Sequence, residues 1–159
     1  MKTELQNAQR LLLGHGALVL LFGFVVGFGF LFFLIGEISL WPIPGAIDYQ
    51  MPGTYDAWRM AHLEGIANGT LLWVLAAVLP ALQSIVARVY RVAVCMIIVA
   101  WTIVIASVLD PLFPGARGLA FTPESGLAND IAFFLFFIGI VIVCGVVTTV
   151  AVKAFSSSD

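Results

Sequence analysis

Charged residues are scarce in this chain, and their scarcity excludes most classes of soluble protein. Only 10% of the 159 residues are Asp, Glu, Lys or Arg, whereas a soluble domain carries about a quarter. Hydrophobic residues make up 62% of the chain, which excludes intrinsic disorder. The net charge of −2 offers no basic surface for nucleic acid. The composition therefore indicates a membrane protein.

Residues that usually carry polar catalysis are few as well. Of the two cysteines, Cys95 and Cys144, each lies in an apolar run, where cysteine packs as a small hydrophobic residue. No group of His, Cys, Asp or Glu has the spacing of metal ligands, and glycine-rich phosphate loops and Ser–His–acid patterns are lacking. We therefore set aside nucleotide chemistry, serine-type hydrolysis and metal sites built from clustered side chains.

What the chain does have is four long hydrophobic runs. Each is close to or above the roughly 20 apolar residues that a helix needs to cross a bilayer. The predicted spans cover residues 11–36, 61–88, 92–109 and 131–154. The first is too long for a signal-peptide core, so we expect it to be retained. The sequence predicts an all-α, integral membrane four-helix bundle, with residues 1–159 forming a single membrane domain.

Basic residues predict the orientation of this bundle. Most of them flank the two termini or the connection between the second and third spans: Lys2, Arg10, Arg88, Arg91 and Lys153. Arg59 and Arg117 belong to the opposite side. Because cytoplasmic loops carry the excess of Lys and Arg, we expect a multi-pass protein of the cell's inner membrane with both termini in the cytoplasm.

The connections predict how the helices are joined. Residues 41–58 hold three prolines and four aromatic residues, which suits a rigid cap at the level of the lipid headgroups. Residues 110–130 are similar, and Asn129 or Asp130 is the candidate N-cap of the fourth helix. The connection between the second and third spans is very short, so those helices are expected to be antiparallel neighbours.

The second span opens with polar residues where a membrane helix normally has apolar ones. Its first residues, RMAHLEGIANGT (59–70), include His62, Glu64 and Asn68. On a helix, His62 and Asn68 share one face with Gly65 and Gly69, and Glu64 lies at the margin of that face. Polar groups inside a membrane are costly and mark functional sites. This stretch is therefore the candidate site.

Two interpretations of the site remain open. In the first, Gly65 and Gly69 form a G-x-x-x-G pair for helix packing, and the polar residues lie half solvated at the interface. In the second, the glycines clear room for a porphyrin whose iron takes His62 as its axial ligand. The haem propionates would then need cations, for which we expect Arg59 or Arg117; the alternative is that these are ordinary interfacial arginines.

The other histidine, His15, is predicted to lie far from His62. The two belong to opposite ends of their spans, on the order of 20–30 Å apart along the membrane normal. They are not expected to hold one haem between them, so a bound haem would have one protein ligand and an open sixth position. His15 is interpreted as a packing or hydrogen-bonded residue.

Several motifs, in order and in register, resemble the styrene oxide isomerase family. They are GHG at the head of the first span, PG-x(4)-W at residues 52–58, AH-x-x-G-x-x-NG at residues 61–69, and RGL-x-F-x-P-x-x-G-x-x-x-D at residues 117–130. The resemblance implies a small four-helix membrane protein that forms homotrimers and holds haem b near the subunit interfaces. It also implies that His62 is the axial ligand and that Asn68 lines the pocket and positions the substrate oxygen.

The implied reaction converts an apolar epoxide into an aldehyde. Ferric iron acts as a Lewis acid, the C–O bond opens toward a benzylic cation, and a 1,2-hydride shift completes the change in a dry cavity. The chain departs from the family pattern in its third span, where Ser107 or Val108 stands near the position of a pocket tyrosine and Val99 or Ala100 near that of an acid. Glu64 is additional. Haem binding is thus implied more directly than turnover of styrene oxide itself.

Two other functions remain open from the residues alone. One is a b-type haem subunit in electron transfer, although such sites usually take two strong axial ligands. The other is a cofactor-free accessory subunit of a membrane complex, with an unidentified membrane protein as its partner. The spin state of the iron would separate an isomerase from an electron-transfer protein, and the lack of any chromophore would favour the accessory subunit.

Overall fold

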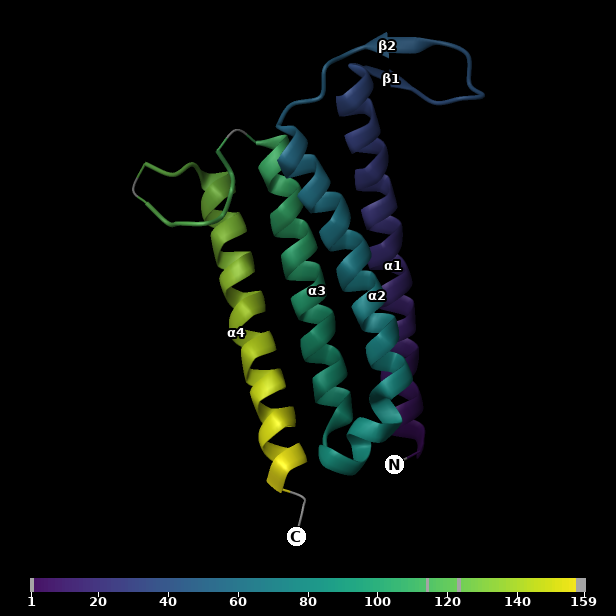
Figure 1. The fold of residues 1–159 in the computed structure, drawn as a ribbon, viewed down its shortest axis with the longest axis vertical. Helices are drawn as coiled ribbons and strands as arrows, with labels where there is room; N and C mark the ends of the chain where they lie inside the picture. Colours follow the sequence, from purple (N-terminus) through teal and green to yellow (C-terminus); the bar gives the residue numbers. More distant parts are fainter. Residues whose placement is uncertain (1, 114, 123, 157–159) are drawn as a thin grey trace.

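Four long helices and one short hairpin make up the protein (Figure 1). The computed structural model describes residues 2–113, 115–122 and 124–156. The helices and strands run, in chain order, α1 Lys2–Ile35, β1 Glu37–Ser39, β2 Ala46–Asp48, α2 Tyr55–Ile85, α3 Val89–Leu112 and α4 Leu127–Ser156. All four helices are long and apolar enough to cross a membrane. The predicted all-α, four-span fold is confirmed.

Every helix begins before the apolar run that predicted it, whereas α1 and α2 end at Ile35 and Ile85, slightly short of the predicted limits. α2 begins at Tyr55, because the Thr54 hydroxyl caps it by accepting a hydrogen bond from the Ala57 N–H at 3.3 Å. α1 begins at Lys2, and Gln9 ties its first turns to α2 by donating to the Ala76 carbonyl at 3.0 Å. Backbone and side-chain hydrogen bonds therefore continue the helices past the limits set by hydropathy.

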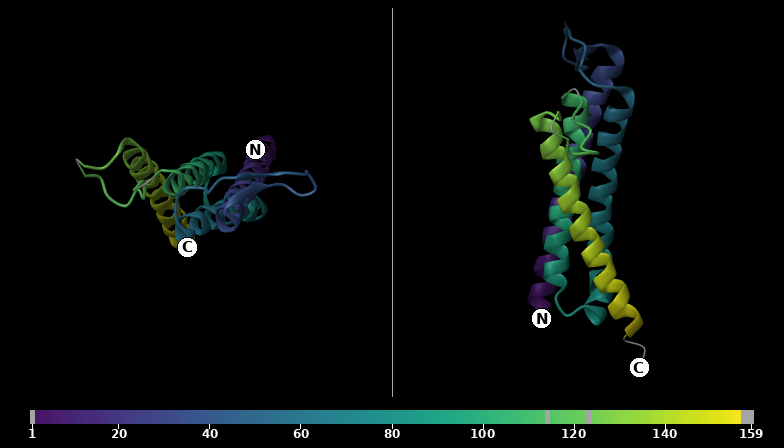
Figure 2. Two further views of the ribbon diagram at one scale, coloured as in Figure 1. Left: turned by 90° about the horizontal axis from the view of Figure 1, so that it is seen from above. Right: turned by 90° about the vertical axis from the view of Figure 1, so that its left-hand side faces the viewer.

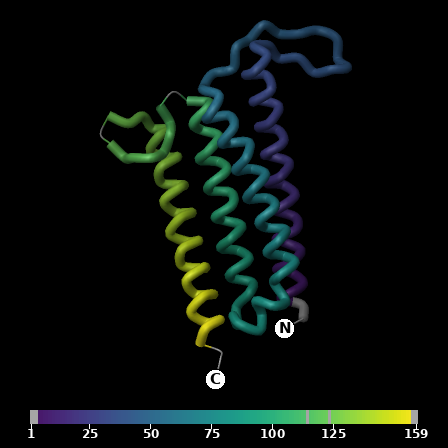
Figure 3. The backbone as a smooth tube through the Cα atoms, in the orientation of Figure 1, coloured from purple at the N-terminus to yellow at the C-terminus, as the bar shows by residue number. Residues whose placement is uncertain are grey.

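α1, α2 and α3 pack against one another, and α4 lies beside α3 (Figures 1 and 2). α1 packs most closely on α2, α3 lies against both α2 and α4, and α4 touches α2 only slightly. A short turn joins α2 to α3, and these two helices are antiparallel neighbours, as predicted. Both termini lie at one end of the bundle, and the two longer connections lie at the other (Figure 3).

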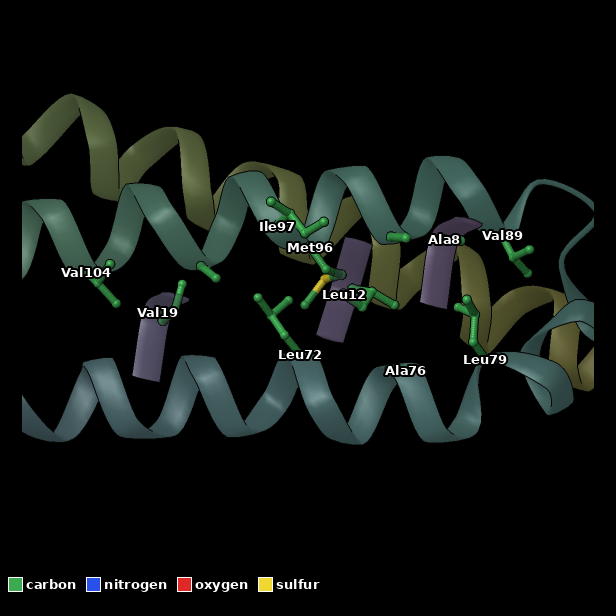
Figure 4. Close-up of a cluster of buried hydrophobic side chains, with 12 residues drawn as sticks. Ala8, Leu12, Val19, Leu72, Ala76, Leu79, Val89, Met96, Ile97 and Val104 are labelled. Carbon is green, nitrogen blue, oxygen red and sulfur yellow. The ribbon is translucent and has the colours of Figure 1, made fainter. Parts of the chain in front are cut away.

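The hydrophobic core is built by α1, α2 and α3 (Figure 4). Its buried members come from each of these three helices and include Ala8, Leu12, Val19, Leu72, Ala76, Leu79, Val89, Met96, Ile97 and Val104. α4 contributes mainly partly buried residues, among them Val143 and Val146. The fourth helix is therefore the most peripheral element, with much of its surface open to lipid.

The two longer connections are ordered by different means. β1 and β2 pair antiparallel, with Ile38 opposite Ile47, and extend the end of α1. In the connection before α4, Asn129 accepts a hydrogen bond from the Gly118 N–H and donates one to the Ala120 carbonyl, both at 2.8 Å. α4 begins at Leu127, so the predicted N-cap at Asn129 or Asp130 is wrong. The Asn129 amide braces the loop from within the first turn of the helix instead.

Candidate functional site

His62 projects from α2 toward α1. Its Nδ1 lies 2.9 Å from the carbonyl oxygen of Gly23. The ring is also close to Gly27, where a Cβ would lie 2.8 Å from both Cε1 and Nδ1. Glycine at position 27 thus provides the space that the imidazole occupies.

The Gly23 contact determines which ring nitrogen carries the proton. A carbonyl oxygen can only accept a hydrogen bond, so Nδ1 of His62 must be the donor. In the neutral ring, Nε2 then keeps its lone pair. Histidine ligands of metals are typically oriented by such a bond from the other ring nitrogen to a carbonyl or carboxylate. His62 is therefore held in the form that can bind a metal through Nε2.

His15 is held in the opposite tautomer. The indole N–H of Trp101 donates to its Nδ1 at 3.1 Å, and the two rings meet edge to face with centroids 6.5 Å apart. Because an indole N–H can only donate, Nδ1 of His15 is the acceptor and the ring proton lies on Nε2. The interpretation of His15 as a hydrogen-bonded packing residue is confirmed.

The two histidines also lie at different depths. Gly16, next to His15, packs against Trp73 of α2, whose indole N–H donates to the Leu13 carbonyl at 3.0 Å. Trp73 follows His62 by eleven residues, which at 1.5 Å per residue is about 16 Å along the helix. This separation is smaller than the 20–30 Å expected from the sequence, but it is still too large for both rings to ligate one iron.

Glu64 projects toward α3 rather than toward α1. The hydroxyl of Ser107, a buried residue of α3, donates a hydrogen bond to Oε2 of Glu64. Asn68 lies one turn further along α2, and its Nδ2 donates to the backbone carbonyl of Glu64 at 3.0 Å. That bond uses one of the two amide hydrogens of Asn68. Glu64, Asn68 and Ser107 thus form a polar group on the α3 side of α2.

The face that the sequence assigned to the site is divided between two neighbouring helices. Gly65, at its centre, is pressed against α1, where its Cβ would lie 2.5 Å from the Cα of Gly23. At about 100° per residue, Asn68 is rotated by about 120° from His62 around the helix axis. The structure therefore directs His62 to one side of α2 and the group containing Asn68 to the other.

The G-x-x-x-G pair serves the packing of α2 on α1. A Cβ on Gly69 would lie 2.8 Å from the backbone nitrogen of Leu20 and 2.9 Å from the carbonyl oxygen of Gly16. The space beside Gly65 and Gly69 that was expected to admit a porphyrin is thus filled by α1. Of the two interpretations of these glycines, helix packing accounts for their positions without a cofactor.

Arg59 and Arg117 are brought together at one pocket. A cavity of about 460 Å³ opens near the start of α2, and both arginines line it together with Glu64. Its other lining residues are Asp56, Met60, Leu63 and Ala67. Both arginine side chains are exposed. The pocket thus holds two cations and two carboxyl groups, and His62 is not among its lining residues.

Sequence reasoning placed Ser107 near the position of the family's pocket tyrosine, but it did not predict two contacts in this region. One is the contact of Ser107 with Glu64, which joins α2 to α3; its signal was a hydroxyl within an apolar span. The other is the contact of the Gly23 carbonyl with His62, which orients the ring. A backbone acceptor leaves no trace in residue type, so only the fold could reveal it.

Comparison with known proteins identifies the family to which the sequence is similar. A family model described as styrene oxide isomerase matches residues 8–155. A styrene-oxide isomerase of Pseudomonas fluorescens is 30% identical over 128 residues, which cover 80% of this chain and 74% of that protein.

The family match runs through all four helices and includes the polar residues of the site. It begins at residue 8, within α1, and ends at residue 155, near the end of α4. His62, Glu64, Asn68 and Ser107 all lie inside it. An isomerase function is supported at the level of the family. On the evidence of its four-span fold and of this nearly full-length match, the chain belongs to the styrene oxide isomerase family.

Proposed function

We propose that this protein is a membrane isomerase that converts an apolar epoxide into an aldehyde and depends on haem b bound through His62. Family membership supports the isomerase class, and one observation supports the cofactor. The Nδ1–H of His62 is held by the Gly23 carbonyl, so that Nε2 is the nitrogen with a lone pair.

The residues of the chain fit a haem with one protein ligand. His62 supplies that ligand, and at least one of Arg59 and Arg117 binds a propionate, because both line a pocket on the same helix end. When bound, ferric haem supplies a Lewis acid for the oxygen of the epoxide. A haem with two strong axial ligands, as electron transfer usually requires, is disfavoured. His15 is about 16 Å from His62 along the bundle, and its Nδ1 already accepts a hydrogen bond from Trp101.

The proposed isomerisation requires no net proton transfer by the protein. One epoxide C–O bond breaks, a hydride moves to the adjacent carbon with its electron pair, and a C=O bond forms, so every atom of the substrate is kept. The protein must bind an apolar molecule, hold its oxygen and exclude water, which would trap the cation as a diol. We assign Asn68 to the positioning of the oxygen through its second amide hydrogen.

The site is proposed to lie between copies of the chain in a homotrimer. Within one copy, His62 projects toward α1 whereas Asn68 lies on the α3 side of α2. Two copies can present these residues to one cavity, and the resemblance to trimeric isomerases favours that arrangement. We propose that the trimer lies in the inner membrane with both termini in the cytoplasm; this is supported by Arg10, Arg88 and Arg91, which lie at the end of the bundle that carries the termini.

The first test is spectroscopic and uses the two histidines as a matched pair. In detergent-purified protein, we expect a Soret band and a high-spin ferric EPR signal in the wild type and in His15→Ala. Both signals should be lost in His62→Ala, and the double variant Arg59→Gln/Arg117→Gln should retain less haem. Aldehyde formation from an aryl epoxide should fall by at least 100-fold in His62→Ala, because the Lewis acid is absent.

Other outcomes would contradict the proposal in distinct ways. A low-spin spectrum would indicate a second axial ligand and electron transfer. Wild-type protein made with ample haem but lacking a Soret band would point to an accessory subunit. Full haem content in the arginine double variant would remove only the propionate assignment.

A further inference from the structure

α3 and α4 separate toward the end of the bundle that carries both termini. α4 contacts α3 at Gly139, where a Cβ would lie 2.9 Å from Oγ1 of Thr102. Beyond that point, no described residue of α4 is buried. A groove of about 610 Å³ opens between the two helices along this stretch.

The groove has the dimensions and chemistry of one membrane leaflet. On α4 its lining runs from Val141 to Lys153, which at 1.5 Å per residue is about 18 Å. One leaflet of the hydrocarbon core is about 15 Å thick. The inner part of the groove is lined by apolar or small residues such as Val141, Cys95 and Gly145. A lipid acyl chain matches this shape and polarity.

Cations are concentrated at the end of the groove that lies nearest the two termini. Arg88 and Arg91 come from the start of α3 and Lys153 from the end of α4, and none of the described lining residues is acidic. Arg88 and Arg91 are both exposed. Basic pockets between membrane helices that lie at headgroup level bind the phosphates of anionic lipids.

A second copy of the chain is a poorer occupant of this groove. Arg10 belongs to the same end of the bundle, and Glu4 is the only acidic side chain that the structure describes there. Pairing two copies through the cationic end of the groove would therefore bring like charges together, which opposes association. An anionic headgroup meets the same cations with complementary charge.

We propose that the α3–α4 groove binds one anionic phospholipid, with its headgroup phosphate at Arg88 and Arg91 and an acyl chain along Cys95, Val141 and Gly145. The proposal concerns a site separate from His62 and does not depend on the isomerase activity. It is tested by native mass spectrometry of the full-length protein in its purified oligomeric form, with added dioleoylphosphatidylglycerol or dioleoylphosphatidylcholine.

Charge variants examine the headgroup end. We expect phosphatidylglycerol to be retained in preference to phosphatidylcholine. Arg88→Gln/Arg91→Gln should weaken its binding by about tenfold or more, since each cation near an anionic headgroup contributes roughly fivefold. Arg10→Gln removes a charge at the same end outside the groove, so its affinity should stay within about twofold of the wild type.

Glycine variants examine the apolar end. A Cβ on Gly145 would meet nothing within 4 Å, so the side chain of Gly145→Leu can fill the groove without a clash. We expect it to lose phosphatidylglycerol while the protein stays folded. Gly14 is equally open but does not line the groove, and Gly14→Leu should bind the lipid normally. Millimolar inorganic phosphate should not displace the lipid if the acyl chain contributes.

Three results would overturn the proposal. Equal retention of the two lipids would remove the role of charge. If Gly145→Leu bound phosphatidylglycerol as the wild type does, or if inorganic phosphate alone displaced the lipid, the groove would not hold the acyl chain. A change of oligomeric state in Gly145→Leu with lipid binding intact would make the groove a subunit interface.

Discussion

The partner of a single ring nitrogen distinguishes the two histidines of this protein. His62 donates from Nδ1 to a carbonyl and keeps a lone pair on Nε2, whereas His15 accepts at Nδ1 from Trp101. The residue type is the same, and both lie in membrane-spanning helices. Only His62 is thus prepared as a ligand, because metal binding needs an unprotonated nitrogen that is not already engaged.

Glu64 and Ser107 provide a prediction at the scale of single residues. Ser107→Ala leaves the half-buried Glu64 carboxyl without its donor from α3, which should lower the free energy of unfolding by about 1–3 kcal/mol. Replacing both residues, as Glu64→Leu/Ser107→Ala, should recover much of the loss, since no polar group is then stranded. Denaturant unfolding in detergent micelles measures the difference.

The control for this pair is an exposed hydroxyl group. Thr148 is exposed on α4, and Thr148→Ala should change stability by less than about 0.5 kcal/mol. If Ser107→Ala were no more costly than Thr148→Ala, the hydrogen bond between Ser107 and Glu64 would not stabilise the α2–α3 interface.

At the scale of elements, the contact between α1 and α2 depends on glycine. A Cβ on Gly65 would lie 2.5 Å from the Gly23 Cα, and a backbone atom cannot move aside as a flexible side chain can. Gly65→Ala should therefore destabilise the protein by about 1–3 kcal/mol through overpacking. The shift should also displace His62, one turn away, and reduce haem content.

Gly14→Ala is the matched control, since it makes the same change in the neighbouring helix. A Cβ there meets nothing within 4 Å. Alanine is favoured over glycine in a helix by up to about 1 kcal/mol, so Gly14→Ala should be neutral or stabilising in thermal unfolding. Similar effects of the two substitutions would mean that α1 and α2 are not in such close contact.

Hydropathy predicted which segments form helices but not where they end. The number, order and antiparallel pairing of the spans followed from the apolar runs and the short connection after α2. Helix ends depend instead on hydrogen bonds, such as the Thr54 cap of α2 and the Gln9 contact of α1. The misplaced N-cap of α4 has the same origin, because the partners of Asn129 come from the folded loop.

At the scale of the whole molecule, the most decisive prediction concerns the subunit arrangement in the proposed homotrimer. His62→Ala and Asn68→Ala are each expected to abolish epoxide turnover. If one copy supplies His62 and its neighbour Asn68, co-expression of the two variants should restore activity to about a quarter of the wild-type level, the share of intact sites in a randomly mixed cyclic trimer.

A double variant provides the comparison. Co-expressing wild-type protein with His62→Ala/Asn68→Ala gives the same total of intact residues, and it should also yield about a quarter of active sites when the residues come from different copies. If both residues came from the same copy, the first mixture would be inactive and the second would reach about half. Aldehyde formation by the purified mixed trimers distinguishes these cases.

The sequence alone determined that this is a four-span membrane protein and singled out the polar residues of the candidate site, because both depend on residue type along one helix. It also placed Arg59 and Arg117 on the side opposite most of the basic residues. The tertiary structure decided what those residues face. Helix packing assigned the glycine pair to α1, gave His62 its carbonyl partner and turned Glu64 toward Ser107, since each of these depends on a neighbouring helix that is distant in the sequence.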